Sequence, residues 1–371
     1  MDLLIHREEL VRALARAQGI AEKRSTSPVL SSVLLQASGE TLRATATDKA
    51  ITLIADYAAT IKTPGEVAVD ATNFFQAAKV LRGDIVTLRL LDNGRLEVRS
   101  GSAVYNLTTF PATEFPVTPA LDQARTMTVD AGGLRRTIDR VHFSVAGDDN
   151  RYGLNGAHVE DTSTTDGAVV RFVGTDGNRL SWAQVPYRGE LGIGRKMLLP
   201  RKGLGEVRKL LDGYEGEVGI SFGERAALVQ WPGVLVHVRL LEADFPDYRQ
   251  VLPTSFKRRA IIEKDAFREA LKSVSILATD ASNSVKFQFS PEGLVLSARK
   301  LDAGDSRDEV AMEYSGEPIA MGFNARFVGE VLSVLDGTRV SVELGDALSP
   351  CILRDMDDDG ALFVVMPVRL D

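Results

Sequence analysis

Cysteine and histidine are scarce in this chain. Cys351 is the only cysteine among 371 residues, so no disulfide can form within the chain, as is usual in a reducing cytoplasm. The four histidines have no spacing that suits a metal site or a catalytic triad: His6, His142, His158 and His237. We therefore expect no metal, no cofactor and no catalytic residue. Cys351 lies in a β-like stretch, and we interpret it as a core or edge thiol.

Long apolar runs are absent as well. No run approaches the about 20 residues that a membrane-spanning helix needs, and residues 1–10 lack the apolar core of a signal peptide. The sequence therefore predicts a cytoplasmic protein that does not enter a membrane. A net charge of −7, taken as a total, disfavours a nucleic-acid ligand, but the placement of charge matters more than the total.

Two motif matches are incomplete. Gly192 and Gly194 resemble part of a dinucleotide-binding loop, but no third glycine follows at the required spacing and no strand–helix–strand unit surrounds them. Residues 355–360 match the start of a calcium-binding loop, yet the twelfth position is Met366 rather than glutamate. We interpret residues 355–360 as a solvated hairpin turn.

One pattern occurs three times along the chain. An apolar strand, a polar turn and a helical pattern begin at Leu3, Met127 and Ala260. In these helices the apolar residues recur at helical spacing: Leu10, Leu14 and Ala17; Leu134, Ile138 and Val141; Phe267, Leu271 and Val274. The second helices of the copies end at positions that lie 130 and 124 residues apart: Leu81, Leu211 and Leu335. These even intervals predict three tandem copies of one domain.

Each copy is itself doubled. The order of one strand, one helix and three strands occurs twice in every copy, which gives six units of about 60 residues. The predicted fold class is α+β, because each helix is apolar on one face only and should pack on a sheet. Loops rich in proline and polar residues separate the copies. The expected domains are residues 1–120, 126–252 and 258–371.

Positive charge is concentrated on the predicted helices. Six segments hold 16 Lys and Arg against 10 Asp and Glu: 6–18, 72–83, 132–142, 201–213, 263–275 and 324–336. The helices thus carry +6 and the remainder of the chain −13. Arg24 follows the first helix, and Arg201 and Lys202 open the fourth, where free backbone N–H groups would suit a phosphate. The segregation favours a surface that faces nucleic-acid phosphates, although helices also gain cations for solubility alone.

Several local strings carry a family resemblance. They are RYGLNG (151–156), TDGNRL (175–180), LPRKG (199–203), FPDYRQVLP (245–253), GFN (322–324) and VVMPVRL (364–370). Over essentially its whole length the chain resembles the bacterial sliding clamps, the beta subunits of DNA polymerase III. The resemblance implies three tandem DNA-clamp domains, each of two βαβββ units, that dimerise head-to-tail into a closed ring with helices inside and sheets outside. Such a ring encircles duplex DNA of any sequence and tethers the replicative polymerase for processive synthesis.

The resemblance also implies partners and site residues. The partners are a second copy of the chain, double-stranded DNA, the polymerase III catalytic subunit, the clamp loader and other proteins with a clamp-binding motif. Tyr152 joins Arg24, Arg201 and Lys202 as an expected DNA contact. The expected dimer contacts are Tyr105 and Leu107 on an edge strand of the first domain, with Ile276 and Leu277 on the third. The expected partner-peptide site comprises Leu154, Thr175, Gly177, Arg179, Leu180, Pro246, Val251, Asn324, Leu348, Val364, Met366, Pro367, Val368, Arg369 and Leu370.

The chain departs from the usual family pattern at five positions. Asn178 stands where histidine is often found, Gln250 replaces a basic residue, Phe327 replaces a common tyrosine, Gly153 replaces an aromatic, and Asp371 extends the tail. These changes bear on partner affinity and DNA contact. Two other functions stay open: a hydrolase or transferase that uses scattered carboxylates, and a scaffold that binds peptides but not DNA.

Overall fold

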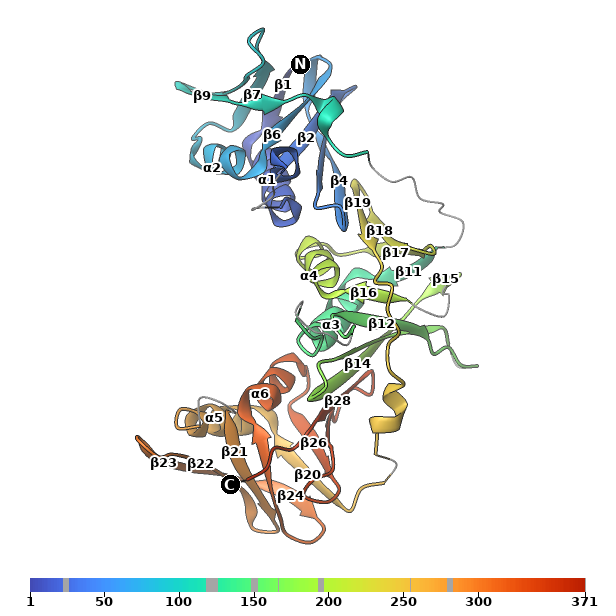
Figure 1. The fold of residues 1–371 in the computed structure, drawn as a ribbon, viewed down its shortest axis with the longest axis vertical. Helices are drawn as coiled ribbons and strands as arrows, with labels where there is room; N and C mark the ends of the chain where they lie inside the picture. Colours follow the sequence, from blue (N-terminus) through green and yellow to red (C-terminus); the bar gives the residue numbers. More distant parts are fainter. Residues whose placement is uncertain are drawn as a thin grey trace. The chain divides into compact units, whose positions relative to one another are not determined.

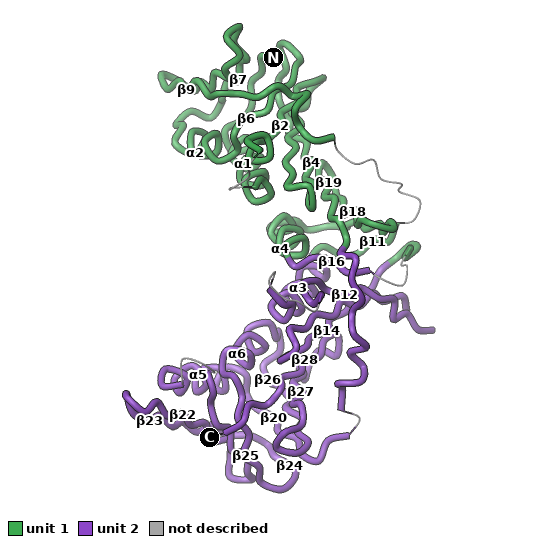
Figure 2. Tube along the Cα trace, in the orientation of Figure 1, with its two compact units in different colours: residues 1–131, 188–194, 202–240 green, residues 132–187, 195–201, 241–371 purple. Residues whose placement is uncertain are grey.

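The computed structural model describes residues 1–22, 27–117, 126–147, 153–165, 167–192, 197–253, 255–278 and 283–370. The chain forms two compact units, drawn in green and purple in Figure 2. Unit 1 consists of residues 1–131, 188–194 and 202–240, and unit 2 of residues 132–187, 195–201 and 241–371. The middle copy of the sequence repeat is thus divided between the two units.

Helices lie where the apolar periodicity predicts them. In the described residues they are α1 (Arg7–Ile20), α2 (Ala71–Val80), α3 (Ala131–His142), α4 (Arg201–Leu210), α5 (Lys264–Ser275) and α6 (Ala325–Val334) (Figure 1). All nine apolar residues that the helical spacing singled out are buried. Leu81, Leu211 and Leu335 are buried too, but each follows the last helical residue, so the second helices end one residue earlier than predicted.

Strands fill the remainder of each copy. The first copy contains β1 (Asp2–His6), β2 (Ser32–Ser38), β3 (Thr41–Thr47), β4 (Ile51–Ala58), β5 (Thr60–Thr63), β6 (Gly65–Asp70), β7 (Ile85–Leu90), β8 (Leu96–Ser100), β9 (Ala103–Leu107) and β10 (Thr109–Phe110). The second contains β11 (Met127–Asp130), β12 (Gly156–Asp161), β13 (Val169–Thr175), β14 (Arg179–Pro186), β15 (Arg188–Gly189), β16 (Leu198–Pro200), β17 (Glu217–Phe222), β18 (Ala226–Trp231) and β19 (Val234–Arg239). The third contains β20 (Arg258–Glu263), β21 (Ser284–Ser290), β22 (Gly293–Lys300), β23 (Gly304–Val310), β24 (Met312–Ser315), β25 (Ile319–Asn324), β26 (Arg339–Leu344), β27 (Cys351–Asp355) and β28 (Ala361–Val365).

The predicted order of strand, helix and three strands is confirmed twice in every copy. In the described residues, only the short strands β5, β10, β15 and β24 are additional. The strands pair antiparallel in four sheets. Unit 1 holds the orders β5-β1-β7-β8-β9 and β10-β6-β2-β3-β4-β19-β18-β17-β11-β15. Unit 2 holds β16-β12-β13-β14-β28-β27-β26-β20-β24 and β23-β22-β21-β25.

Two sheets continue from one copy of the repeat into the next. In unit 1, β4 pairs with β19, from Ile51 opposite Val238 to Ala55 opposite Val234. In unit 2, β14 pairs with β28, from Arg179 opposite Val365 to Ala183 opposite Ala361. In both joints the third strand after the first helix of one copy meets the third strand after the second helix of the next copy. The equivalent strands β23 and β9 lie at the edges of their sheets.

The segments that resembled metal or thiol sites are structural. Residues 356–360 connect β27 to β28, which confirms the predicted hairpin turn there. The prediction was wrong for Asp355, which ends β27 and is buried. Cys351 is buried in β27 between two neighbouring strands, and burial raises the pKa of its thiol, so it is a core thiol. Among the described residues, no cluster of His, Cys, Asp or Glu is placed to hold a metal ion. No helix in that part of the chain is long and apolar enough to cross a membrane.

Candidate functional site

The carboxy-terminal tail leaves β28 and lies across two other elements of unit 2. The Met366 N–H donates to the Asn178 carbonyl at 2.9 Å, and the Val368 N–H donates to the Gly322 carbonyl at 2.8 Å. A Cβ atom at Gly322 would lie 2.6 Å from the Val368 carbonyl oxygen, so only glycine lets the tail approach β25 this closely. The tail is therefore part of the folded unit, and its position depends on Gly322.

The turn between β13 and β14 gathers several of the predicted peptide-site residues. The Thr175 hydroxyl donates to the Arg179 carbonyl at 2.7 Å, and Gly177 adopts a φ of 89°, which the turn requires. Leu180 is the cross-strand partner of both Thr175 and Val364. The Ala146 N–H donates to the carbonyls of Leu154 and Thr175, at 3.1 and 3.2 Å, which places Leu154 beside the turn.

Arg179, a residue of the predicted peptide site, is buried and links three parts of unit 2. Its guanidinium forms ion pairs with Asp176, at 3.0 Å, and with Glu330 of α6, and it donates to the Phe143 carbonyl at 2.6 Å. The same group lies 4.3 Å from the ring centroid of Phe327. Arg179 thus links β14 to α6, and its positive charge is balanced by carboxylates of the same chain.

Replacing Arg179 with alanine is expected to lower the free energy of unfolding by about 3 kcal/mol, because two carboxylates and a carbonyl lose a buried partner. Arg326 supplies a matched control, since it pairs with the same Glu330 at 3.1 Å but its side chain is 67% exposed. Arg326→Ala should cost less than about 1 kcal/mol. Urea unfolding of both variants checks the difference, and equal losses would contradict the assigned role.

The segment after β19 is held on unit 2 by a polar cluster that the sequence did not reveal. The hydroxyl of buried Tyr248 donates to one Glu160 oxygen and Arg249 donates to the other, each at 2.6 Å. The Phe245 ring stacks on His158 with centroids 5.4 Å apart, and burial lowers the pKa of His158. Phe245 and Tyr248 pack with a core cluster that includes Leu180 and Val364.

The remaining peptide-site residues differ in exposure. Four of the ten large apolar side chains that are exposed in the described part of the chain belong to the predicted site: Val251, Leu348, Met366 and Leu370. Asn324 accepts from the Arg326 N–H at 3.0 Å and caps α6, while Pro246 and Arg369 are exposed. Leu348 lies in the β26–β27 loop.

The predicted DNA contacts are only partly described. Arg24 and Tyr152 lie outside the described residues. Lys202 is paired with Asp48 in unit 1, so its charge is shared. The Arg201 N–H donates to the Asn155 carbonyl at 2.9 Å, so this first N–H group of α4 is already paired.

The predicted dimer residues lie beside the two sheet edges. Tyr105 and Leu107 are half-buried on edge strand β9, and both line a hollow of about 690 Å³ in unit 1. Ile276 follows α5 in unit 2 and is 77% exposed, whereas Leu277 is half-buried.

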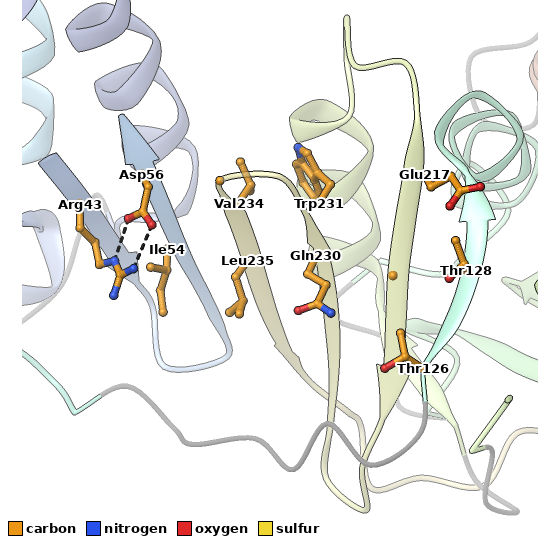
Figure 3. A pocket seen from close by; sticks show the side chains of 12 residues that line it. Arg43, Ile54, Asp56, Thr126, Thr128, Glu217, Gln230, Trp231, Val234 and Leu235 are labelled. Atoms are coloured by element: carbon orange, nitrogen blue, oxygen red, sulfur yellow. Dashed lines mark hydrogen bonds and ion pairs between the residues drawn. The ribbon is translucent and has the colours of Figure 1, made fainter. Parts of the chain in front are cut away.

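Another hollow, of about 580 Å³, lies over the joint between β4 and β19 (Figure 3). Arg43 donates to both oxygens of Asp56, at 2.7 and 2.9 Å, and this contact raises the pKa of Arg43. Ile54 and Leu235 are cross-strand partners at the joint and line the hollow. Because the two charges neutralise each other, we interpret this hollow as the surface of a sheet joint.

Comparison with known proteins covers the whole chain. The N-terminal, central and C-terminal domain families of the DNA polymerase III beta subunit match residues 1–119, 128–247 and 249–369. The chain is 31% identical to the beta sliding clamp of Caulobacter vibrioides and 32% identical to that of Pseudomonas aeruginosa, each over 100% of both chains.

Solved structures agree with the sequence comparison. The clamp of P. aeruginosa bound to griselimycin gives a TM-score of 0.93 at 31% identity, and that of Bartonella birtlesii bound to griselimycin gives 0.94 at 28%, with 100% of each chain covered. These matches confirm the predicted three-domain α+β clamp fold and a non-catalytic role. The chain belongs to the family of bacterial DNA polymerase III beta subunits, the beta sliding clamps that act as processivity factors.

Proposed function

We propose that two copies of this chain associate head-to-tail into a closed ring around duplex DNA, with helices inside and sheets outside. The ring tethers the polymerase III catalytic subunit, the clamp loader and other replication and repair proteins. The pattern of sheet joints carries this proposal. In the pairings β4–β19 and β14–β28, the third strand after the first helix of one copy pairs with the third strand after the second helix of another copy. The two strands that hold these positions and are left at sheet edges are β23 and β9, so the same pattern pairs β23 with β9. Because both strands end a sheet in the described residues, a second chain can complete both joints and close the ring.

Side chains beside the two edges support this joint. The Ser306 hydroxyl of β23 donates to the Val274 carbonyl of α5 at 2.9 Å, so α5 is fixed on the edge strand. Exposed Ile276 follows α5 directly. Pairing β23 with a partner's β9 would bring Ile276 toward the apolar hollow beside Tyr105 and Leu107. Leu277 supports the same contact from the third domain.

Retention on DNA then depends on topology more than on binding strength. A closed ring needs only weak, sequence-independent contacts with phosphates in order to slide. The excess of +6 on the helical segments suits such contacts. Arg24, Tyr152, Arg201 and Lys202 are the proposed contacts, and Lys202 should contribute less than Arg201 because Asp48 already holds its ammonium group.

Replacing Arg24, Arg201 and Lys202 with alanine should flatten the salt dependence of binding to a short linear duplex. The slope of log K against log salt should fall by about 2 to 3, since about one counterion is released for each phosphate contact. Asp48→Asn is the matched control: it frees Lys202 and should steepen the slope. Fluorescence anisotropy at several salt concentrations checks both. An unchanged slope in the triple variant would exclude these cations as DNA contacts.

We further propose that the fifteen predicted residues of unit 2 bind the clamp-binding peptide of a partner protein. The exposed apolar side chains of Val251, Leu348, Met366 and Leu370 support a surface that recognises a short apolar motif.

We place the three domains at residues 1–120, 126–252 and 258–371. We assign the protein to the cytoplasm, where the replication partners act and where a single thiol stays reduced.

A further inference from the structure

One face of the four-stranded sheet of unit 2 is turned away from α5. Phe287 of β21 points toward α5, where its ring lies 6.1 Å from that of Phe267. Since side chains alternate along a strand, Lys286 lies on the opposite face. Lys286 is the cross-strand partner of Gly322, the residue over which the tail crosses β25. The tail and Lys286 therefore occupy the same face of the sheet.

Cations surround a hollow of about 530 Å³ on this face. Lys286, Arg299 and Arg307 line it from β21, β22 and β23, and Arg369 lines it from the tail. Asp305 supplies the carboxylate among the described lining residues, and Glu309 pairs with Arg307 at 2.6 Å. Among the residues that the structure describes here, four cations thus face two carboxylates.

Within the described residues, three of the four cations around this hollow are unpaired. In the part of the chain that the structure describes, Lys286, Arg299 and Arg369 form no ion pair. By contrast, Arg179, Arg140 and Arg171 of the same unit are each bound to carboxylates. A set of unpaired cations around one hollow attracts a ligand that carries several carboxylates.

We propose that this hollow, the basic groove (Lys286, Arg299, Arg307 and Arg369), binds an acidic segment that flanks the clamp-binding peptide of a partner. The inference rests on the proposed peptide site, because Arg369 and Leu370 belong to both. This continuity places the groove next to a bound peptide. A flanking segment on the same chain is then held at high effective concentration, so individually weak ion pairs suffice.

The test uses the full-length protein and a fluorescent clamp-binding peptide from a polymerase III catalytic subunit. Three glutamates, or three glutamines, are added at either end in separate peptides. At about 50 mM salt, glutamates at one end should tighten binding about tenfold relative to glutamines, and the gain should largely vanish at about 0.5 M salt. Lys286→Glu combined with Arg299→Glu should remove the gain and leave binding of the unextended peptide unchanged. Lys272→Glu, an exposed change on α5, should keep the gain.

Each other outcome overturns the inference in a distinguishable way. Equal binding of glutamate and glutamine peptides, with the unextended peptide bound normally, would reject the groove and leave the peptide site standing. Failure of the wild-type protein to bind the unextended peptide would reject the peptide site and the groove together. Binding of a single-stranded oligonucleotide that the double variant abolishes, without any gain from glutamates, would show that the groove serves nucleic acid instead.

Discussion

Deletion of Met366 to Asp371 is expected to weaken binding of a clamp-binding peptide at least about 100-fold while the proposed dimer remains intact. The deletion removes five of the fifteen proposed site residues, and two of these, Met366 and Leu370, have exposed apolar side chains. Loss of a central apolar group from a peptide site costs about 2 kcal/mol or more, and the deletion removes several. Fluorescence anisotropy gives the affinity, and sedimentation gives the oligomeric state.

A single substitution tests whether peptide binding needs the tail in its observed position, and not only the presence of the tail residues. Gly322→Ala keeps every tail residue, but the new methyl group would overlap the Val368 carbonyl oxygen and push the tail off β25. This variant should also lose peptide affinity, by about tenfold or more. Normal peptide binding by the deletion variant would refute the assignment of the tail to the site.

Ile276→Asp and Tyr105→Asp, made separately, are expected to convert the proposed dimer into monomers. Each places a carboxylate in the proposed joint, one on the α5 side and one on β9, and burying an unpaired charge costs several kcal/mol. A loss of about 3 kcal/mol or more raises the dissociation constant at least about 100-fold. Analytical ultracentrifugation over a concentration series measures this change.

Because Ile276 is exposed, Ile276→Asp is the easier of the two variants to interpret. An aspartate at a side chain that is 77% exposed should leave the thermal unfolding of the monomer almost unchanged. Val117→Asp, at a valine that is 93% exposed, is the control and should remain dimeric. A dimer of normal strength in both joint variants would reject the β9–β23 pairing.

Local pattern was sufficient to predict most of the fold. The spacing of Leu10, Leu14 and Ala17, and its two repeats, located the buried helix faces correctly because a helix face is set by neighbouring residues. The hairpin turn at residues 356–360 could also be predicted from the sequence, since turn residues act locally. Helix ends were less exact, because Leu81, Leu211 and Leu335 are buried whether or not they are helical.

Contacts between distant segments could not be predicted in this way. The joint of Ile51 with Val238 links residues far apart in the chain, and no periodicity within either strand encodes the partner. For the same reason the sequence did not predict the ion pairs of Arg179 with Glu330 and of Lys202 with Asp48. Both cations looked available for a ligand in the sequence, and in each case a distant carboxylate already pairs with them.

The most direct test of the ring compares retention on two forms of one DNA. The protein is loaded on a nicked circular duplex by a clamp loader, and release is followed at about 1 M salt, where charge attraction is screened beyond about 3 Å. A closed ring should stay on the circle and leave soon after a single restriction cut makes the DNA linear. Equal release from circular and linear DNA would contradict encirclement, and would favour a scaffold that binds peptides without enclosing DNA.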